Sequence, residues 1–547
     1  MPTLLLLAPI GLPLLAALSQ AAGGWRRRTT GVGLATGALL LAATAALAAE
    51  VLRSGPIRTA GGLLRADALS AWMLLVVGAV ALLVLASGDR HAVRPESRWY
   101  PILLHLFIAT MATAVLAGNL GVLWVAVEAT TIVTAFLVGH YRTRAALEAA
   151  WKYVLICSAA IALALLGTVL LYYAARHAGL AGLSALDWSN LAAHAGRMDP
   201  AVTRIAIGLA VLGFGAKAGL VPLHAWLPDA HSQAPAPISA LMSGVLLSVA
   251  LYAVLRLKLV ADAVLDPAYL RTLLLILALA TLAVAVALLL GQHDYKRLLA
   301  YSSMEHMGLM ALGVAVGGPL AMAAVLLHIA GHGLAKTVAF LGSGHILHRE
   351  GTTRIAGVRG LLSRAPVLGG VFGVATLALL GLPPGALFAS EVGLARALAA
   401  EQLGWVVALA FALVLVGFAA IGARTAGMLL GAPAPAITES ATTEPTAPAP
   451  VAREPVGVGA TASGHAAAGG AATPPVPAGA ATAPVPAGAS SPGPGESRLA
   501  ASQARPDLPR SAAVPLVVGL VVVALLGVTT WPLTDLLTAA ASIAGGS

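Results

Sequence analysis

Long apolar segments separated by short polar ones run along almost the whole chain. Each is about 20 residues, the length that an α-helix needs to cross the hydrocarbon core of a bilayer. We expect about fourteen such segments, near residues 3–22, 31–52, 68–87, 99–117, 119–138, 148–175, 202–222, 236–257, 268–290, 297–316, 319–346, 366–400, 404–430 and 511–533. The pattern therefore predicts an all-α polytopic membrane protein with about fourteen transmembrane helices.

Two of these segments contain helix breakers next to a charge. The seventh carries Lys217 shortly before Pro222, and the twelfth contains GLPPGALFASE, in which Gly381 to Gly385 precede Glu391. Backbone that leaves the helix at membrane depth is tolerated where it lines a cavity. The breaks lie five segments apart, and five is odd, so two five-helix units would have opposite topology, which is typical of inverted-repeat transporters. We expect two broken helices, one in each repeat.

Residues 432–510 have a different composition. They are rich in Ala, Pro, Gly and Thr, have few charges and show no apolar periodicity, so we expect a disordered linker. The resulting division of the chain is residues 1–98 with the first three helices, 99–258 and 268–430 with one repeat each, the linker 432–510, and 511–547 with a C-terminal transmembrane helix.

Composition supports a membrane protein. The chain of 547 residues is 59% hydrophobic and 10% charged, with a mean hydropathy of +0.90, whereas soluble domains carry about 25% charged residues. The net charge of +10 is assigned to Arg and Lys in the loops that flank the spans, Arg256 and Lys258 among them. We expect a multi-pass protein of the cell (inner) membrane, in contact with lipid and not with nucleic acid.

Cysteine usage limits the redox chemistry that the chain itself can carry. Cys157 is the only cysteine, so the chain cannot hold a thiolate-ligated iron–sulfur cluster or a C-x-x-C-H haem site. It also has no P-loop and no dinucleotide-binding fingerprint. We expect no cofactor and no catalytic redox site in this chain.

Glu128 and Lys217 are the first pair of candidate functional residues, because both lie within apolar segments. Ionisable residues within the bilayer usually mark an ion or proton path. A Glu128–Lys217 pair would act as a switch that retains the lysine proton when closed and releases it when open. The alternatives are an acid satisfied by Thr130 and Thr131 and a lysine that extends to the interface.

His328, His332 and Lys336 follow one another at intervals of four residues in LLHIAGHGLAKTVAFL. This spacing places all three on one face of a helix, over roughly 12 Å of depth at 1.5 Å per residue, which suits proton transfer between imidazoles and an amine. Zinc is an alternative for two histidines at i, i+4, but no carboxylate or thiol completes the set nearby, so we expect no metal. A backbone hydrogen bond of His328 is a further alternative.

The remaining candidates are less specific. Glu391 follows the second break and is either the terminal acid of the path or a residue near the membrane edge. Glu305 and His306 lie in the tenth segment and either line the path or make a packing contact. Glu148 and Lys152 have the spacing of an interfacial ion pair. The first break itself carries three further groups that either line the proton entry or cap a short helix: His224, Asp229 and His231.

Four motifs resemble the antiporter-like, proton-translocating membrane subunits of complex I, Mrp antiporters and membrane-bound group 4 hydrogenases. They are GAKAGLVPLHAWLPDAHSQAPAPISALMSG, HGLAKTVAFL, LLAYSSMEHMG and the GLPP…SE turn. The stretch EATTIVTAFLVGHYRTRAALEAAWKYVLICS is most similar to the F component of hydrogenase-4. The resemblance implies two inverted five-helix bundles, the Glu128–Lys217 pair, a connecting Lys336 with His332, and a terminal charge at Glu391.

The chain departs from this family at Ser248. Related subunits often carry Lys or His there, and a serine can hold water but cannot store a proton at neutral pH. We therefore expect a central relay that depends on water, His328 and His332.

The resulting hypothesis is a proton-translocating membrane subunit of a redox-driven complex, hydrogenase-4-like or complex I-like, with other membrane subunits and a peripheral redox or catalytic arm as partners. The alternatives are a cation/proton antiporter or ion-coupled uptake subunit without redox chemistry, and a membrane scaffold that transports nothing.

Overall fold

The computed structural model describes residues 2–23, 28–87, 99–432 and 507–545. The expected linker at 432–510 falls almost entirely outside the described residues. The first half of the described chain contains these elements: α1 (Pro2–Gly23), α2 (Arg28–Ser54), β1 (Ile57–Arg58), η1 (Ala60–Gly62), β2 (Arg65–Ala66), α3 (Ala68–Ser87), α4 (Trp99–Leu116), α5 (Leu120–Val138), η2 (Gly139–Tyr141), α6 (Arg144–His177), η3 (Gly182–Leu186), α7 (Trp188–Ala193), η4 (Ala195–Arg197) and α8 (Pro200–Lys217).

The second half begins with the first break and ends at the C-terminal helices. Its elements are α9 (Trp226–Gln233), α10 (Ala236–Leu241), the π-helical turn η5 (Met242–Leu246), α11 (Leu247–Val264), α12 (Pro267–Leu290), α13 (Tyr295–Val316), α14 (Gly318–Glu350), η6 (Ile355–Gly357), α15 (Leu361–Arg364), α16 (Pro366–Leu379), α17 (Ala386–Ala400), α18 (Gly404–Leu430), α20 (Arg510–Val528) and α21 (Thr534–Gly545).

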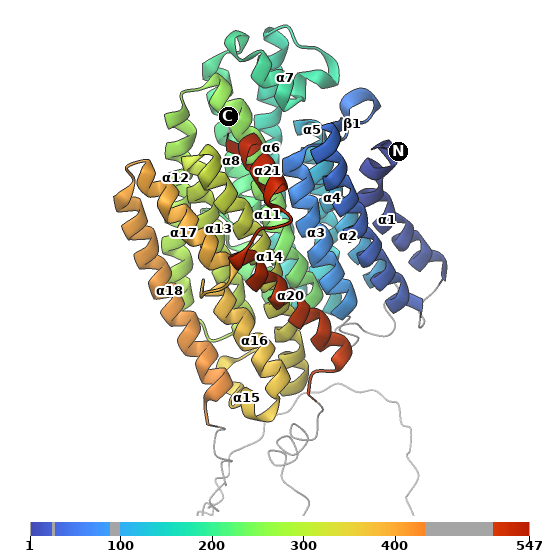
Figure 1. Ribbon diagram of the computed structural model, residues 1–547, viewed down its shortest axis with the longest axis vertical. Helices are drawn as coiled ribbons and strands as arrows, with labels where there is room; N and C mark the ends of the chain where they lie inside the picture. The colour runs from blue at the N-terminus through green and yellow to red at the C-terminus, as the bar shows by residue number, and fades with distance from the viewer. Residues whose placement is uncertain (1, 24–27, 88–98, 433–506, 546–547) are drawn as a thin grey trace, which may run out of the picture. The chain divides into compact units, whose positions relative to one another are not determined.

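The architecture is an all-α bundle of long apolar helices, as the sequence predicts (Figure 1). Twelve helices in the described ranges are long and apolar enough to cross a membrane. The other two expected spans are α13, which carries several charged residues, and the interrupted pair α16–α17, whose halves are short. The count of fourteen and the inverted repeat remain predictions.

Short polar motifs start the helices. Asn119 accepts a hydrogen bond from the Val122 amide at the start of α5, and Asp294 does the same for Arg297 at the start of α13. Asp199 precedes Pro200 at the first position of α8. Such side chains satisfy amides that have no partner within the helix, and proline suits a position that needs no amide donor. These residues therefore fix where the helices begin.

Burial is concentrated in two long segments at the centre. In Ala236–Val264 and Gly318–Glu350 the most apolar stretch is 100% buried, against 33% in α1 and 28% in α20. The first segment (α10, η5 and α11) packs against α14, and a side chain on Gly333 would meet the Gly244 carbonyl at 2.7 Å. This close backbone approach places α14, with its polar residues, inside the protein and away from lipid.

Both predicted breaks are present. α8 ends at Lys217 and helix resumes at Trp226, while α16 ends at Leu379 and α17 begins at Ala386. The C-terminal segment differs from the expected single helix over 511–533, because α20 ends at Val528 and the chain resumes as α21. Pro532 lies in this gap and has no amide to donate to a helix. α21 packs against α14 and α3.

One end of the bundle carries both termini, β1 and α7, whereas α15 lies at the opposite end (Figure 1). The small antiparallel hairpin pairs Ile57 with Ala66 and Arg58 with Arg65.

Candidate functional site

Lys217 is fully buried at the C-terminal end of α8. Its ammonium donates hydrogen bonds to Thr131 Oγ1 at 2.8 Å and to Tyr153 Oη at 2.7 Å. The ring of Tyr153 is 4.6 Å from Nζ and that of Trp226 is 5.9 Å away, both within cation–π range. The lysine is therefore held by neutral groups of α5, α6 and α9 and does not extend to the interface.

Glu128 has a different partner. Ser158 donates a hydrogen bond to its Oε1 at 3.0 Å, and its buried Oε2 accepts none. Glu128 and Lys217, both within the described chain, do not form an ion pair in this structure. The threonines considered as partners are engaged elsewhere, since Thr130 donates to the Val127 carbonyl and Thr131 accepts from Lys217.

Ion pairs join α6, α9 and α13 beside the first break. Lys152 lies 2.6 Å from Glu148, at the spacing predicted from sequence, and 3.1 Å from Asp229. Arg297 of α13 contacts the other oxygen of Asp229. Asp229 thus holds the short helix α9 between two neighbours.

The two histidines of the break differ in exposure. His224 is a half-buried loop residue whose Nδ1 lies 3.2 Å from the Pro222 carbonyl. Partial desolvation lowers its pKa, although this hydrogen bond opposes the shift. His231 is fully buried, stacks on Phe340 at 5.1 Å between centroids, and has no hydrogen-bond partner on either ring nitrogen.

The predicted ladder on α14 is present. His328, His332 and Lys336 are each 0% exposed. The Lys336 ammonium donates to the Leu299 carbonyl at 2.8 Å and to the Ser302 hydroxyl of α13. Neither ring nitrogen of His332 has a hydrogen-bond partner. Because buried polar groups are normally satisfied by protein or water, the unpartnered nitrogens of His332 and His231 mark places for ordered water.

His306 of α13 connects the ladder to α17. Its ring centroid is 5.1 Å from those of both His328 and His332. Glu305, its neighbour in sequence, is 2% exposed and has an unpartnered Oε1. The sequence left open whether this dipeptide lines the path or only packs; the structure places both side chains in the polar interior.

Ser248 is fully buried at the start of α11, directly after η5, and its hydroxyl has no protein partner. Together with His231 and His332, it is a third position at which water, and not a side chain, would make the contact.

Glu391 lies in the first turns of α17 and is 6% exposed, so its carboxylate is enclosed by the protein. Its Oε1 has no hydrogen-bond partner. A Cβ on Gly381 would come within 2.4 Å of Glu391 Oε2, and Gly381 has φ +61°. The glycine of the second break thus provides both the turn and the space for this carboxylate.

The zinc alternative changes once the chain is folded. His328 and His332 have no carboxylate nearby in sequence, but Glu391 and His306 approach His328 from other helices, with one ligand atom of each residue within 4.8 Å of those of the other two. The sequence-based argument against a metal considered only neighbours along one segment and did not include this group.

Sequence patterns missed several partners. Tyr153, Ser158 and Ser390 lie within apolar segments, as polar residues of a helix commonly do, and no local spacing distinguishes them. Lys296, which directly precedes the expected tenth segment, is 2% exposed and donates to the Ser232 and Ala234 carbonyls at the end of α9.

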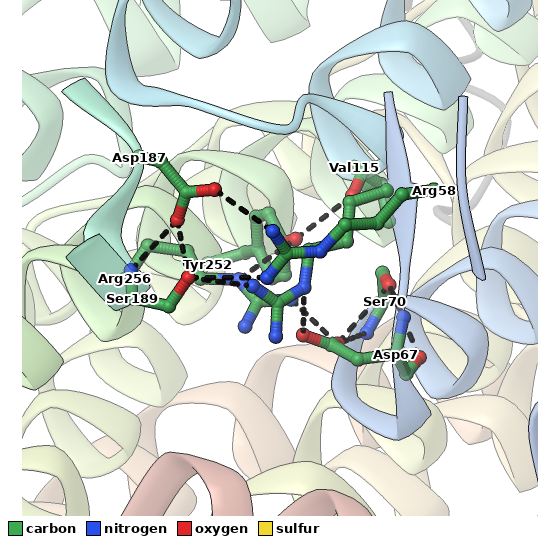
Figure 2. Close-up of polar contacts among 9 residues, drawn as sticks. Arg58, Asp67, Ser70, Val115, Asp187, Ser189, Tyr252 and Arg256 are labelled. Atoms are coloured by element: carbon green, nitrogen blue, oxygen red, sulfur yellow. Dashed lines mark hydrogen bonds and ion pairs between the residues drawn. The ribbon is translucent and has the colours of Figure 1, made fainter. Parts of the chain in front are cut away.

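A cluster of ion pairs joins residues beside α7, with Asp67 and Arg256 buried and Arg58 partly exposed (Figure 2). Arg256, expected in a loop, is 1% exposed within α11 and donates to Asp67 at 2.6 Å and to the Tyr252 hydroxyl at 2.9 Å. Arg58 of the hairpin reaches Asp187 and Ser189. Burial alone would raise the pKa of Asp67, but the charge and hydrogen bond of Arg256, with help from Ser70 and Arg65, lower it to about 2.

The family described as "NADH:quinone oxidoreductase/Mrp antiporter, TM" matches residues 117–417. The chain is 44% identical over 305 residues to the hydrogenase-4 component F homolog of Methylacidiphilum infernorum, covering 55% of this chain and 63% of that protein. It is 33% identical over 292 residues to the N-type subunit of the NADH-quinone oxidoreductase of Desulforudis audaxviator (53% and 56% covered) and 31% identical over 338 residues to the D component of the Na(+)/H(+) antiporter of Alkalihalophilus pseudofirmus (61% and 66% covered). The chain thus spans between half and two thirds of these relatives.

Two solved assemblies contain chains of the same fold. One is the membrane-bound sulfane sulfur reductase, an archaeal respiratory membrane complex, with a TM-score of 0.71 at 26% identity, covering 78% of this chain and 88% of the other. The Mrp complex of Dietzia sp. DQ12-45-1b gives 0.77 at 23% identity, covering 99% and 97%, and shows the fold alone. These findings confirm the resemblance drawn from the four motifs.

Proposed function

The chain belongs to the NADH:quinone oxidoreductase/Mrp antiporter membrane family, and from this we propose that it is the proton-translocating membrane subunit of a multi-subunit, redox-driven complex of the hydrogenase-4 or complex I type. The observation that carries the proposal is a line of buried ionisable side chains contributed by both broken helices and by α13 and α14. Its members are Lys217, His231, Lys336, His332, His306, His328 and Glu391, none more than 6% exposed.

The spacing within this line suits proton transfer. His231 and His332 are near enough to Lys336 to interact electrostatically with it, and Nδ1 of His306 lies 3.1 Å from Nε2 of His328. Buried ionisable groups are costly to maintain within a bilayer and mark ion or proton paths. A scaffold without transport would not require them.

In this proposal, proton release is controlled at Lys217. Thr131 and Tyr153 accept hydrogen bonds from the ammonium without neutralising it, so a change in the charge or position of Glu128 alters the free energy of the lysine proton directly. Electron transfer in a peripheral partner would move Glu128 away from or towards Lys217, and the released proton would pass through His231 and water beside Ser248 to Lys336. The redox centres belong to the partners, and the site of action is the inner cell membrane.

The repeat boundaries at 99–258 and 268–430 remain part of this proposal. In it, Lys217 serves the first half and Glu391 the second, with α14 connecting them. Glu148, Lys152 and Asp229 fix α9 at the entry, and Glu305 provides an additional acid between Lys336 and Glu391, with both of which it interacts electrostatically.

A cation/proton antiporter without redox chemistry is the second candidate. It is favoured by the 31% identity to the D component of the Na(+)/H(+) antiporter. Both candidates use the same relay and differ in the driving reaction.

Replacement of Lys217 in the intact complex tests the proposal. Lys217→Met should abolish proton translocation in vesicles driven by the native electron donor, and unchanged translocation would overturn the relay. Tyr153→Phe removes one of two side-chain acceptors of a charge-assisted hydrogen bond, worth about 1.5–3 kcal/mol, and should slow translocation about 10- to 100-fold. Tyr173→Phe, on the exposed face of the same helix, is the matched control.

The antiporter is tested in the same vesicles without a redox donor. An imposed Na⁺ gradient that drives proton movement through the wild-type complex, and not through Lys217→Met, would favour the second candidate. Copurification of iron–sulfur or nickel-containing subunits with the chain would favour the first.

A further inference from the structure

Three ligand-bearing side chains from three helices converge beside the second break. They are His306 of α13, His328 of α14 and Glu391 of α17, and each offers one ligand atom that lies within 4.8 Å of the ligand atoms of the other two. The three side chains are 3%, 0% and 6% exposed. A set of two imidazoles and one carboxylate is one that zinc uses in proteins, with a fourth position left open.

The hydrogen bonds of Ser390 fix the orientation of His328. The Ser390 hydroxyl donates to the Leu387 carbonyl at 2.8 Å, so towards Nδ1 of His328, 2.9 Å away, it acts as the acceptor. Nδ1 therefore carries the N–H, and in the neutral ring Nε2 has a free lone pair. That lone pair points to the side where His306 lies, since Nε2 is the atom 3.1 Å from Nδ1 of His306.

The neutral His306 ring faces two hydrogen-bond acceptors but has only one N–H to donate. It hydrogen-bonds to the backbone of Leu379 at the end of α16 and it faces the lone pair of His328. A neutral imidazole has a single N–H. When that N–H points to Leu379, two lone pairs face each other, and Oε1 of Glu391 lies nearby without a hydrogen-bond partner. In that tautomer the two lone pairs are satisfied by a cation between them, which is either a proton or a metal ion.

We propose that His306, His328 and Glu391 form a binding site for a divalent transition-metal ion of the Zn²⁺ class. Ser390 and Leu379 take the place that outer-shell partners have in zinc sites, where the second ring nitrogen of each ligating histidine is held by a hydrogen bond. Two nitrogen ligands disfavour Ca²⁺ and Mg²⁺, which prefer oxygen. Zinc–ligand bonds of about 2.0–2.1 Å require the ligand atoms to lie about 3.3 Å from one another, so metal binding would draw the three side chains together.

The metal would compete with protons for the same lone pairs. Resting on the proposed function, this makes the site an inhibitory one: an ion bound there removes His306, His328 and Glu391 from the relay together. Binding itself does not depend on the relay, so the two ideas can be tested separately.

Co²⁺ is the probe, because its visible d–d bands report tetrahedral nitrogen and oxygen coordination without any measurement of activity. The purified intact complex, after prolonged incubation because the site is buried, should bind one Co²⁺ per chain at this site, with Zn²⁺ displacing it. His306→Gln and Glu391→Gln should each lower the affinity at least about 100-fold. Ser390→Ala, which leaves all three ligands, should lower it about 10- to 100-fold, as for other outer-shell changes.

His332→Gln and His177→Gln are the controls. His332 lies one turn from His328 on α14, with ring centroids 6.5 Å apart, and His177 is an exposed histidine at the end of α6; both variants should retain the Co²⁺ spectrum. Absence of a tetrahedral spectrum in the wild type, or a spectrum and affinity unchanged in His306→Gln, overturns the metal site.

The outcomes separate this proposal from the relay. Stoichiometric Co²⁺ binding together with normal proton translocation in Lys217→Met would retain the metal site and reject the relay. Loss of translocation in Lys217→Met without stoichiometric Co²⁺ binding in the wild type would retain the relay and reject the metal site.

Discussion

Arg256 Nη2 lies 2.6 Å from Asp67 Oδ1 and joins α11 to the start of α3 across 189 positions of sequence. Both side chains are buried, and the guanidinium also lies over the ring of Trp188 at 4.8 Å from its centroid. These contacts of Arg256 hold α11 against the start of α3, where Asp67 lies (Figure 2), and against α7, which carries Trp188.

Removal of one partner of this pair should destabilise the protein strongly. Asp67→Asn leaves the buried Arg256 charge without a carboxylate partner, which costs about 3–5 kcal/mol, and thermal unfolding of the detergent-solubilised complex should shift accordingly. Arg256→Leu should cost less, because Asp67 keeps Arg65 at 3.5 Å. The double variant should lose less than the sum of the single ones. Arg53→Ala, which breaks the exposed pair with Glu50 at 4.0 Å, should change stability by less than about 1 kcal/mol. Equal effects of Asp67→Asn and Arg53→Ala would contradict this role.

The pH dependence of stability follows from Asp67. Its pKa of about 2 in the folded protein is below the value of about 3.9 expected when unfolded. The stabilisation is therefore fully present above pH ~4 and is lost as the pH falls towards 2. The stability difference between wild type and Asp67→Asn should be constant from pH 7 to pH ~4.5 and shrink below that. A difference that disappears already between pH 7 and 5 would show that another group is responsible.

Gly381 should not tolerate a side chain. An alanine Cβ would lie 2.4 Å from Glu391 Oε2, at a residue with φ +61°, which costs an L-residue about 1–2 kcal/mol. Gly381→Ala should lower stability by at least that amount and displace the carboxylate, with reduced proton translocation and Co²⁺ affinity. Gly370→Ala in α16, where a Cβ would meet nothing within 4 Å, should be neutral or stabilising. Wild-type translocation and Co²⁺ binding in Gly381→Ala would mean that the position of Glu391 is not critical.

The Ser248 hydroxyl should contribute to the rate of proton translocation. If water beside Ser248 connects Lys217 with Lys336, Ser248→Ala removes an anchor of that water and should slow translocation several-fold without a change in folding, since the substitution deletes one unpartnered atom. Ser343→Ala is the matched control, because the Ser343 hydroxyl is buried and already bonded to the Phe340 carbonyl of its own helix. Equal rates in the two variants would place the proton path elsewhere.

The sequence was sufficient for the helices, the two breaks and the α14 ladder, because each depends on local features. Apolar length predicts a span, proline and glycine interrupt it, and a spacing of four residues places His328 and Lys336 on one face. The exceptions are informative. α20 stops at Val528, before Pro532. α13 is less apolar than the other spans because it carries polar residues, which are buried in the interior of the bundle and do not face lipid.

The hydrogen-bond and ion-pair partners of the buried charged residues could not be predicted from sequence patterns, because they depend on which helices pack together. Lys217 was matched with Glu128 because both lie within apolar segments, yet the fold gives the lysine Tyr153 and Thr131 as hydrogen-bond partners. Arg256 looked like a loop residue because it follows an apolar run, but α11 continues to Val264 and the Asp67 carboxylate compensates its burial.

The sequence by itself determined that this chain is a bundle of membrane helices with ionisable residues in its interior, since hydrophobic periodicity and breakers act within a few turns of chain. Only the tertiary structure decided which of those residues meet. Glu391 reaches His306 and His328 because α13, α14 and α17 pack around the second break. Packing of distant helices sets such distances, and no spacing along the chain records them.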